Sequence, residues 1–210
     1  LDIRAIERDG VDVVRRFTGG RALLHAGELT YSIVAGTGRP PFDTHLQDSY
    51  KRISEALVWA LRFVGVEASI SEGRPASGHR SLSKPCLDSV SRHEITAGGR
   101  KIVASAQRRT RNAFLQHGSI LLTPASGSIV DYLSSPGVSL SERVTSIFEE
   151  VGAEVDRALL RKAVVRGFEE TFGVAFESLR LSEEEEREIQ RRREAVREAP
   201  GPGPRREVVL

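Results

Sequence analysis

Residues 98–122, GGRKIVASAQRRTRNAFLQHGSILL, decide the fold of this chain. A Gly-Gly pair opens the stretch, polar and apolar residues then roughly alternate, and a basic connection at residues 108–111 separates two halves, which predicts two strands joined by a turn. Residues 103–107 carry almost no side-chain bulk, so a ligand can approach the backbone there. A lysine at position 101 beside such a strand suits a site that binds a carbonyl or an anion. The alternative is an ordinary pair of strands with a solvated lysine.

The rest of the chain mixes helices and strands without a regular β-α-β order. This mixture predicts an α+β or mixed-sheet α/β class. Apolar residues recur at helical spacing over residues 44–64 and 157–172, and further helices are predicted over residues 1–9, 141–152 and, after an N-cap at Ser182, up to 198. Strands are predicted over residues 11–15, 28–35, 66–70 and 174–181. The final residues, 200–210, have the composition of a disordered tail.

Composition bounds the class of protein. The chain has 210 residues, of which 39% are hydrophobic and 29% charged, so we expect one domain with a sizeable core. The net charge is only +2 and both signs are interspersed, which does not favour nucleic-acid binding. No run approaches the roughly 20 apolar residues of a membrane span, and no charged-then-apolar leader opens the sequence, so a cytoplasmic setting without a membrane partner is expected.

A second glycine pair lies in residues 15–25, RRFTGGRALLH. Gly19 and Gly20 allow a tight turn that presents backbone N–H groups to an anion or carbonyl, while the flanking arginines supply charge. The alternative is a tight hairpin with exposed arginines. The chain's single cysteine, Cys86, follows Lys84 in a turn-rich segment and cannot form an internal disulfide, so it is either an accessible, reactive thiol or a small buried hydrophobe.

Taken together, three segments resemble the lipoate-protein ligase A/octanoyltransferase family, relatives of the biotin protein ligases. The segments are residues 15–25, residues 28–32 (ELTYS) and residues 99–107 (GRKIVASAQ) leading to LQHGS at 115–119. Their order and spacing match the family over most of residues 10–180. The resemblance implies an α+β domain with a mixed, largely antiparallel sheet flanked by helices, of the biotin/lipoate protein ligase type.

Within that family, the glycine-pair hairpin and the Gly-x-Lys strand line one pocket for a medium-chain acyl group, and the lysine contacts the carbonyl end of that group. Carried over to this chain, the resemblance implies these substrate-binding residues: Arg16, Thr18, Gly19, Gly20, Arg21, Ala22, His25, Ser105, Ala106, Gln107, His117 and Gly118. We expect the two histidines to brace loops rather than to act as bases. A metal site is not expected, because no Cys or carboxylate cluster has ligand spacing.

Two branches of the family imply different cofactors. Ligases activate free lipoate with ATP, and many carry an extra C-terminal domain, whereas cysteine-dependent octanoyltransferases take octanoate from acyl carrier protein as a thioester and need no nucleotide. The segment beginning at Cys86 resembles the transferase pattern Cys-Phe-x-x-x-Ser-x-x-Glu, with Ser91 and Glu94 in place and Leu87 departing from it. The resemblance therefore favours a transferase in which Cys86 is the nucleophile.

In this hypothesis Cys86 takes the octanoyl, or lipoyl, group from acyl carrier protein as a thioester, and a lysine of a lipoyl domain then accepts it. The acceptor is a glycine cleavage H protein or a dehydrogenase E2. Lys101 favours the thiolate and, with nearby backbone N–H groups, stabilises the oxyanion. No cofactor is expected. One alternative is an ATP-dependent lipoate-protein ligase, which would use ATP and Mg; another is an inactive scaffold that binds lipoyl domains.

The same reading divides the chain into three parts. Residues 1–181 form the catalytic domain, residues 182–198 a charged C-terminal helix, and residues 199–210 a disordered tail. Family members begin with strands and a helix that this sequence lacks, and the chain starts at Leu1 and contains no methionine. We therefore expect that the N-terminal part of the domain is missing.

Overall fold

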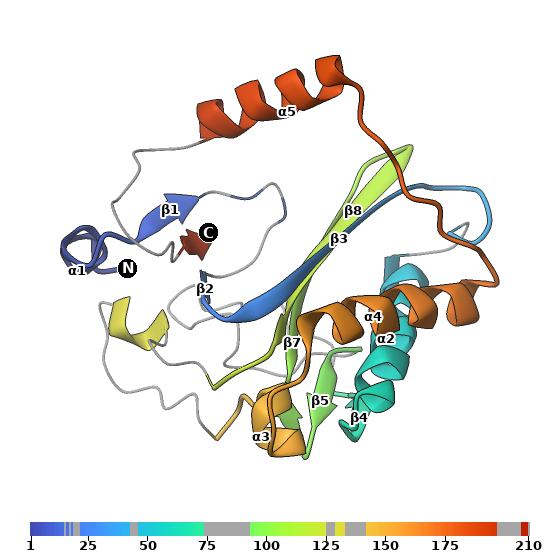
Figure 1. Cartoon of the computed structure of the whole chain (residues 1–210), viewed down its shortest axis with the longest axis horizontal. Helices are drawn as coiled ribbons and strands as arrows, with labels where there is room; N and C mark the ends of the chain where they lie inside the picture. Colours follow the sequence, from blue (N-terminus) through green and yellow to red (C-terminus); the bar gives the residue numbers. More distant parts are fainter. Residues whose placement is uncertain are drawn as a thin grey trace.

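A computed structural model of the chain describes residues 1–14, 16, 18, 22–42, 46–73, 93–124, 129–132, 142–196 and 207–209. Helices and strands alternate irregularly along the chain (Figure 1). The helices are α1 Ile3–Arg8, α2 Leu46–Phe63, α3 Ile147–Val151, α4 Arg157–Phe172 and α5 Glu183–Val196, with a 3₁₀ helix at Ile129–Tyr132. The strands are β1 Asp12–Val14, β2 Leu23–His25, β3 Glu28–Gly36, β4 Ala68–Ile70, β5 Ile95–Ala97, β6 Arg100–Lys101, β7 Val103–Arg109, β8 Ala113–Leu121 and β9 Glu207–Val209.

Residues 98–122 form the centre of the fold. Gly98 and Gly99, with φ of +54° and +76°, make the two-residue turn that joins β5 to β6. Positive φ at both central positions suits a tight hairpin, and glycine adopts it without steric cost. The chain continues into β7, which pairs with β8 in an antiparallel hairpin closed at Thr110, and β8 also pairs along its whole length with β3. The predicted pair of strands is confirmed.

Helices α2 and α4 cover one face of the β3-β8-β7 sheet (Figure 1). Their apolar sides pack on Val103, Phe114 and Ile120 of the sheet to form the main core. The two helices cross closely at Gly167, where an added Cβ would lie 2.4 Å from the carbonyl oxygen of Ala56. The helical spacing read from the sequence therefore located both helices of this layer.

The opposite face of the sheet meets the two ends of the chain. Ala104 and Leu121 pack there against the buried side of α1, Leu23 of β2 and Tyr132 of the 3₁₀ helix, which form a second core cluster. Strand β9 lies between β1 and β2, parallel to the first and antiparallel to the second. The prediction of a disordered tail is thus wrong for Glu207–Val209, because these residues pair with strands about 200 positions earlier in the sequence.

Two other predicted elements differ from the structure. The strand expected over residues 174–181 is absent: these residues are all exposed and irregular, and no strand in the described part of the chain pairs with them. The helix expected over residues 141–152 is shorter, since α3 begins only after Ser146, whose side chain caps it at Glu149. Among the described residues, no helix is long and apolar enough to cross a membrane.

Candidate functional site

The two faces of the central sheet receive different members of the predicted site. Side chains alternate along a strand, so residues in direct register share a face. Ala106 is in register with His117 and Ser32, whereas Ser105 is in register with Gly118 and Tyr31. The first set lies on the face toward the chain termini and the second on the face toward α2 and α4. The predicted run 105–107 therefore contributes only Ala106 to the face that carries His117.

His117 contacts Thr18, which lies 99 positions earlier in the chain. The Nε2 atom of His117 and Oγ1 of Thr18 are 2.6 Å apart, and Thr18 is buried. Burial lowers the pKa of His117 below its usual 6.5, and electrostatic repulsion from Arg16 and His25 lowers it further. Near neutral pH the ring is therefore neutral, so it forms this hydrogen bond without a net charge.

His25 lies beside the same strand with two polar neighbours. Its Nδ1 atom is 2.7 Å from Oε1 of Glu28 and 3.4 Å from Oγ of Ser119. The side chain of Glu28 is only 7% exposed, so its carboxylate fixes one ring nitrogen of His25 in a largely dry environment. His25 was predicted as a site residue, whereas Glu28 and Ser119 were quoted only as parts of the motifs; the spacing of three positions between His25 and Glu28 was the signal that could have found this pair.

The other face carries a hydrogen-bonded network that the sequence did not reveal. Tyr31 Oη lies 2.6 Å from Oγ of Ser105 and accepts from Nε2 of Gln116 at 3.2 Å. Gln107 donates to Oε1 of Gln116 at 2.9 Å and to Oγ of Ser49 on α2 at 3.4 Å. Burial raises the pKa of Tyr31, which stays protonated and able to donate. Gln107 thus joins the sheet to α2, and Ser105 joins β7 to β3.

Lys101 lies at the start of the hairpin, two residues before β7. Its side chain is 1% exposed, and its Nζ atom is 2.7 Å from Oε1 of Glu94, whose side chain is 11% exposed. The backbone N–H of Lys101 donates to Arg143, and its carbonyl accepts from Thr145. The solvated lysine of the alternative reading is therefore excluded. The resemblance to the transferase pattern named Glu94, but not as the partner of Lys101.

For the remaining predicted site residues, the structure describes few contacts or none. Cys86, Gly19, Gly20 and Arg21 lie outside the described residues. Arg16 and Ala22 are half-buried, and Arg16 is near enough to His117 to affect its pKa. Among the described residues, no group of three His, Cys, Asp or Glu side chains is arranged to hold a metal ion.

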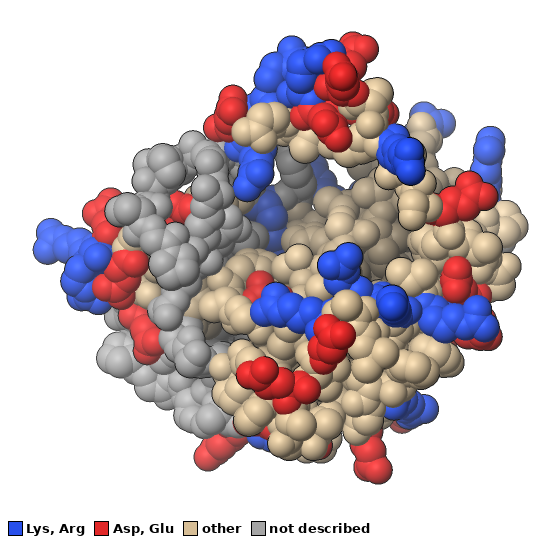
Figure 2. All heavy atoms as spheres, in the orientation of Figure 1, with Lys and Arg blue, Asp and Glu red and all other residues tan. Residues whose placement is uncertain are grey.

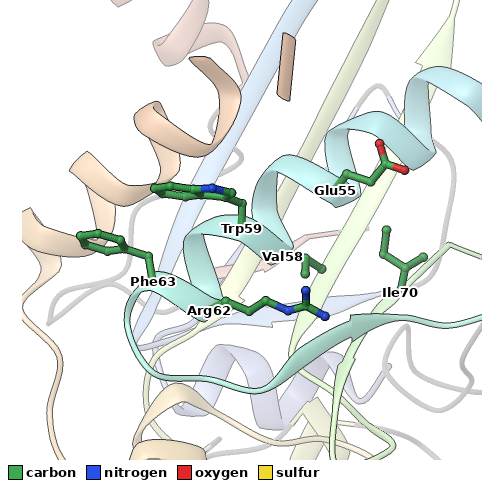
Figure 3. A pocket seen from close by; sticks show the side chains of 6 residues that line it. All are labelled: Glu55, Val58, Trp59, Arg62, Phe63 and Ile70. Carbon is green, nitrogen blue, oxygen red and sulfur yellow. The ribbon is translucent and has the colours of Figure 1, made fainter. Parts of the chain in front are cut away.

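A cleft of about 630 Å³ lies between α2 and the end of β4. Its lining is Glu55, Val58, Trp59, Arg62, Phe63 and Ile70, and Figure 3 shows the rings of Trp59 and Phe63 side by side along the helix. The rings stack with centroids 5.4 Å apart. Since this lining includes no residue of the predicted site and no nucleophile, we assign no chemistry to it.

The charged side chains form no large patch of one sign on the face shown in Figure 2, where basic and acidic groups are mixed. On α5 this mixing is regular, because Arg187, Arg191 and Arg192 each pair with a glutamate three or four positions earlier. Such exposed pairs are worth little individually, and the helix is a solvated surface.

A family model, two curated relatives and a solved structure that resemble this chain all belong to lipoate-protein ligases and octanoyltransferases. The sequence profile of the lipoyl protein ligase A/B catalytic domain matches residues 1–169. "Octanoyltransferase LipM" of Moorella thermoacetica is 36% identical over 184 residues, covering 84% of this chain and 67% of that protein, and its namesake in Kyrpidia tusciae is 37% identical over 198 residues, covering 88% and 72%. A crystal structure of lipoate-protein ligase A bound with ATP superimposes with a TM-score of 0.69 at 28% identity, covering 91% of this chain and 71% of that one.

Proposed function

Because the chain belongs to the lipoyl protein ligase A/B catalytic domain family, we propose that it is an octanoyltransferase of protein lipoylation that carries the acyl group on Cys86. The observation that supports this most strongly is the similarity to proteins named octanoyltransferase LipM, at 36% and 37% identity over most of the chain. The mixed helices and antiparallel sheets of the fold agree with it.

The reaction has two steps that balance without a nucleotide. The thiolate of Cys86 attacks the carbonyl carbon of an octanoyl thioester on acyl carrier protein, the carbon–sulfur bond to the carrier breaks, and the carrier sulfur leaves as a thiolate that takes up the proton lost from Cys86. The amine of a lysine on a lipoyl domain then attacks the new thioester, the amide forms, a proton is lost from nitrogen, and the Cys86 thiol is released. Thioester exchange leaves the acyl group activated, so no cofactor is required for either step.

Lys101 supplies positive charge in this scheme. A buried ammonium attracts a developing oxyanion more strongly than an exposed one, because little water screens it. Two features of Lys101 support that role: its side chain is buried, and its backbone is fixed by hydrogen bonds to Arg143 and Thr145. The half-buried Ala106, in register with His117, places a small side chain beside a polar one, which suits the end of an acyl chain next to its carbonyl.

The test begins with octanoyl-acyl carrier protein, no ATP, and intact-mass analysis of the protein. A single octanoyl adduct that hydroxylamine removes is expected on the wild type and not on Cys86→Ser; since Cys86 is the only cysteine, no other thiol can account for it. Lys101→Met should slow formation of the adduct, whereas Lys51→Met is the matched control, because Lys51 is an exposed surface lysine on α2. Addition of a lipoyl domain should then discharge the adduct.

A second candidate is an ATP-dependent lipoate-protein ligase. The similarity to lipoate-protein ligase A bound with ATP favours it. Acylation of the lipoyl domain by free lipoate that needs ATP and Mg, and that Cys86→Ser leaves unchanged, would establish this activity and reject the transferase.

A further inference from the structure

The burial of Lys101 requires an explanation. Among the described residues that are buried, it is the only one with a charged side chain. Removal of an ammonium from water costs several kcal/mol unless an acceptor compensates. Arg100, the neighbouring residue on β6, is 33% exposed and reaches Glu150 at the surface. The fold therefore treats the two adjacent cations differently, and only Lys101 is turned inward.

Glu94, the residue immediately before the neighbouring strand β5, provides the compensating carboxylate. Thr96 of β5 is in register with Lys101, so Glu94, two positions before Thr96, is the diagonal neighbour of Lys101 on the same face. The 2.7 Å contact between Oε1 and Nζ is a charge-assisted hydrogen bond. An ammonium carries three N–H donors, so this bond does not by itself exclude another to an acyl carbonyl.

The backbone that carries Glu94 is held in an unusual conformation. His93, immediately before it, has φ of +68°, a left-handed conformation that costs a non-glycine residue about 1 kcal/mol or more. Three hydrogen bonds fix these two residues: His93 N to Ser71 O, Ser71 N to Glu94 O, and Ser54 Oγ to His93 O. The α2 helix and the end of β4 thus hold the segment so that the Glu94 side chain turns toward Lys101.

We infer that Glu94 is a positioning residue for acyl transfer, whose carboxylate holds the Lys101 ammonium at the carbonyl oxygen of the acyl group. This inference rests on the proposed function, which assigns that oxygen to Lys101. A purely structural role would require only that a negative charge neutralise a buried cation. A positioning role requires in addition that the carboxylate stand at the correct distance.

Glu94→Asp separates the two roles, because it keeps the charge but shortens the side chain by one methylene. We expect kcat per folded molecule to fall by roughly 10²-fold, the effect of a misplacement of about 1 Å, with KM for the lipoyl domain nearly unchanged. Glu94→Gln, which keeps the length and removes the charge, should also lose kcat. Glu55→Gln is the matched control, since it removes the carboxylate of an exposed lysine–glutamate pair, Lys51–Glu55 on α2, and it should keep wild-type kcat. Urea unfolding of each variant gives the folded fraction.

A parallel titration with octanoate separates the possible failures. If the wild type transfers octanoate while Glu94→Asp keeps its kcat, the positioning role is wrong and the transferase stands. If the wild type forms no acyl-enzyme but binds octanoate, and Glu94→Asp weakens that binding about tenfold, Glu94 positions Lys101 in a site of another activity. An inactive wild type whose octanoate affinity is indifferent to Glu94 overturns both.

Discussion

Gly118 lies on β8 between Ser105 of β7 and Tyr31 of β3. Its replacement by alanine tests whether this glycine is needed for packing of the sheet or for binding of a ligand. An added Cβ would lie 2.4 Å from the carbonyl oxygen of Ala104, 2.7 Å from Cε1 of Tyr31 and 3.0 Å from Oγ of Ser105. The Ala104 oxygen belongs to the β7 backbone, and Tyr31 is held by its hydrogen bonds, so neither can move freely. Overpacking costs about 1–3 kcal/mol and a lost hydrogen bond about 1 kcal/mol more, so we expect a loss of roughly 2–4 kcal/mol.

Urea unfolding followed by far-ultraviolet circular dichroism measures this loss as a lower midpoint. Gly36→Ala is the matched control on the same sheet: Gly36 ends β3, its φ is not positive, and the nearest atom to an added Cβ is the Asn112 oxygen at 3.8 Å. That variant should change stability by less than about 1 kcal/mol and in the favourable direction, because alanine restricts the unfolded chain.

The same pair of variants bears on the predicted substrate-binding role of Gly118. Since the missing Cβ points toward Tyr31 and Ser105, the acyl-transfer rate per folded molecule should be close to that of the wild type. A Gly118→Ala protein as stable as the wild type would refute the packing argument. A stable variant that no longer binds octanoate would place Gly118 against the acyl chain instead.

Three other features give expected outcomes. The pKa of His117 in the folded state lies below 6.5, so as the pH falls the unfolded chain binds a proton at this residue before the folded chain does. The free energy of unfolding therefore decreases as the pH drops below about 6.5. In urea titrations between about pH 7.5 and 5.5, His117→Gln should lose less stability than the wild type. Gly167→Ala should destabilise by roughly 1–3 kcal/mol in the same assay, because the contact with Ala56 outweighs the better helix propensity of alanine. Ser182→Ala removes a capping box with Glu185 and should speed amide exchange in the first turn of α5, with the urea midpoint unchanged because that helix is exposed.

Local patterns in the sequence were sufficient for the elements that build the core. The glycine pair at 98–99 and the alternation after it placed the central hairpin, and the apolar spacing of residues 157–172 gave the bounds of α4. These signals are short-range, since turn chemistry and helical periodicity are set by neighbouring residues. The contacts between site residues could not be predicted from such local patterns. Thr18 and His117 meet only because two distant segments pack on one face of the sheet.

Strand pairing explains the two errors near the end of the chain. Residues 174–181 include strand-favouring residues such as Val174 and Phe176, yet none of the described strands pairs with them, and they remain irregular. The short run Glu207–Val209, which follows a Pro/Gly-rich segment, lies in the slot between β1 and β2 and becomes a strand. For both segments, formation of a strand depends on whether a strand distant in the sequence is available to pair with it, and composition and β-propensity carry no information about such a partner.

The alternation of β7 separates two tasks that the sequence places side by side. Ser105 and Gln107 face the helices, where their hydrogen bonds to Tyr31, Gln116 and Ser49 compensate for burial of polar groups against α2. Ala104 and Ala106 face the other way: Ala104 is buried in the second core cluster, whereas the half-buried Ala106 is in register with His117. A larger side chain at Ala104, Ser105 or Gln107 should therefore change stability, because each of these residues is already packed or hydrogen-bonded. Under the proposed function, Ala106 is the position of this strand at which we expect a larger side chain to exclude an acyl chain while the fold is kept.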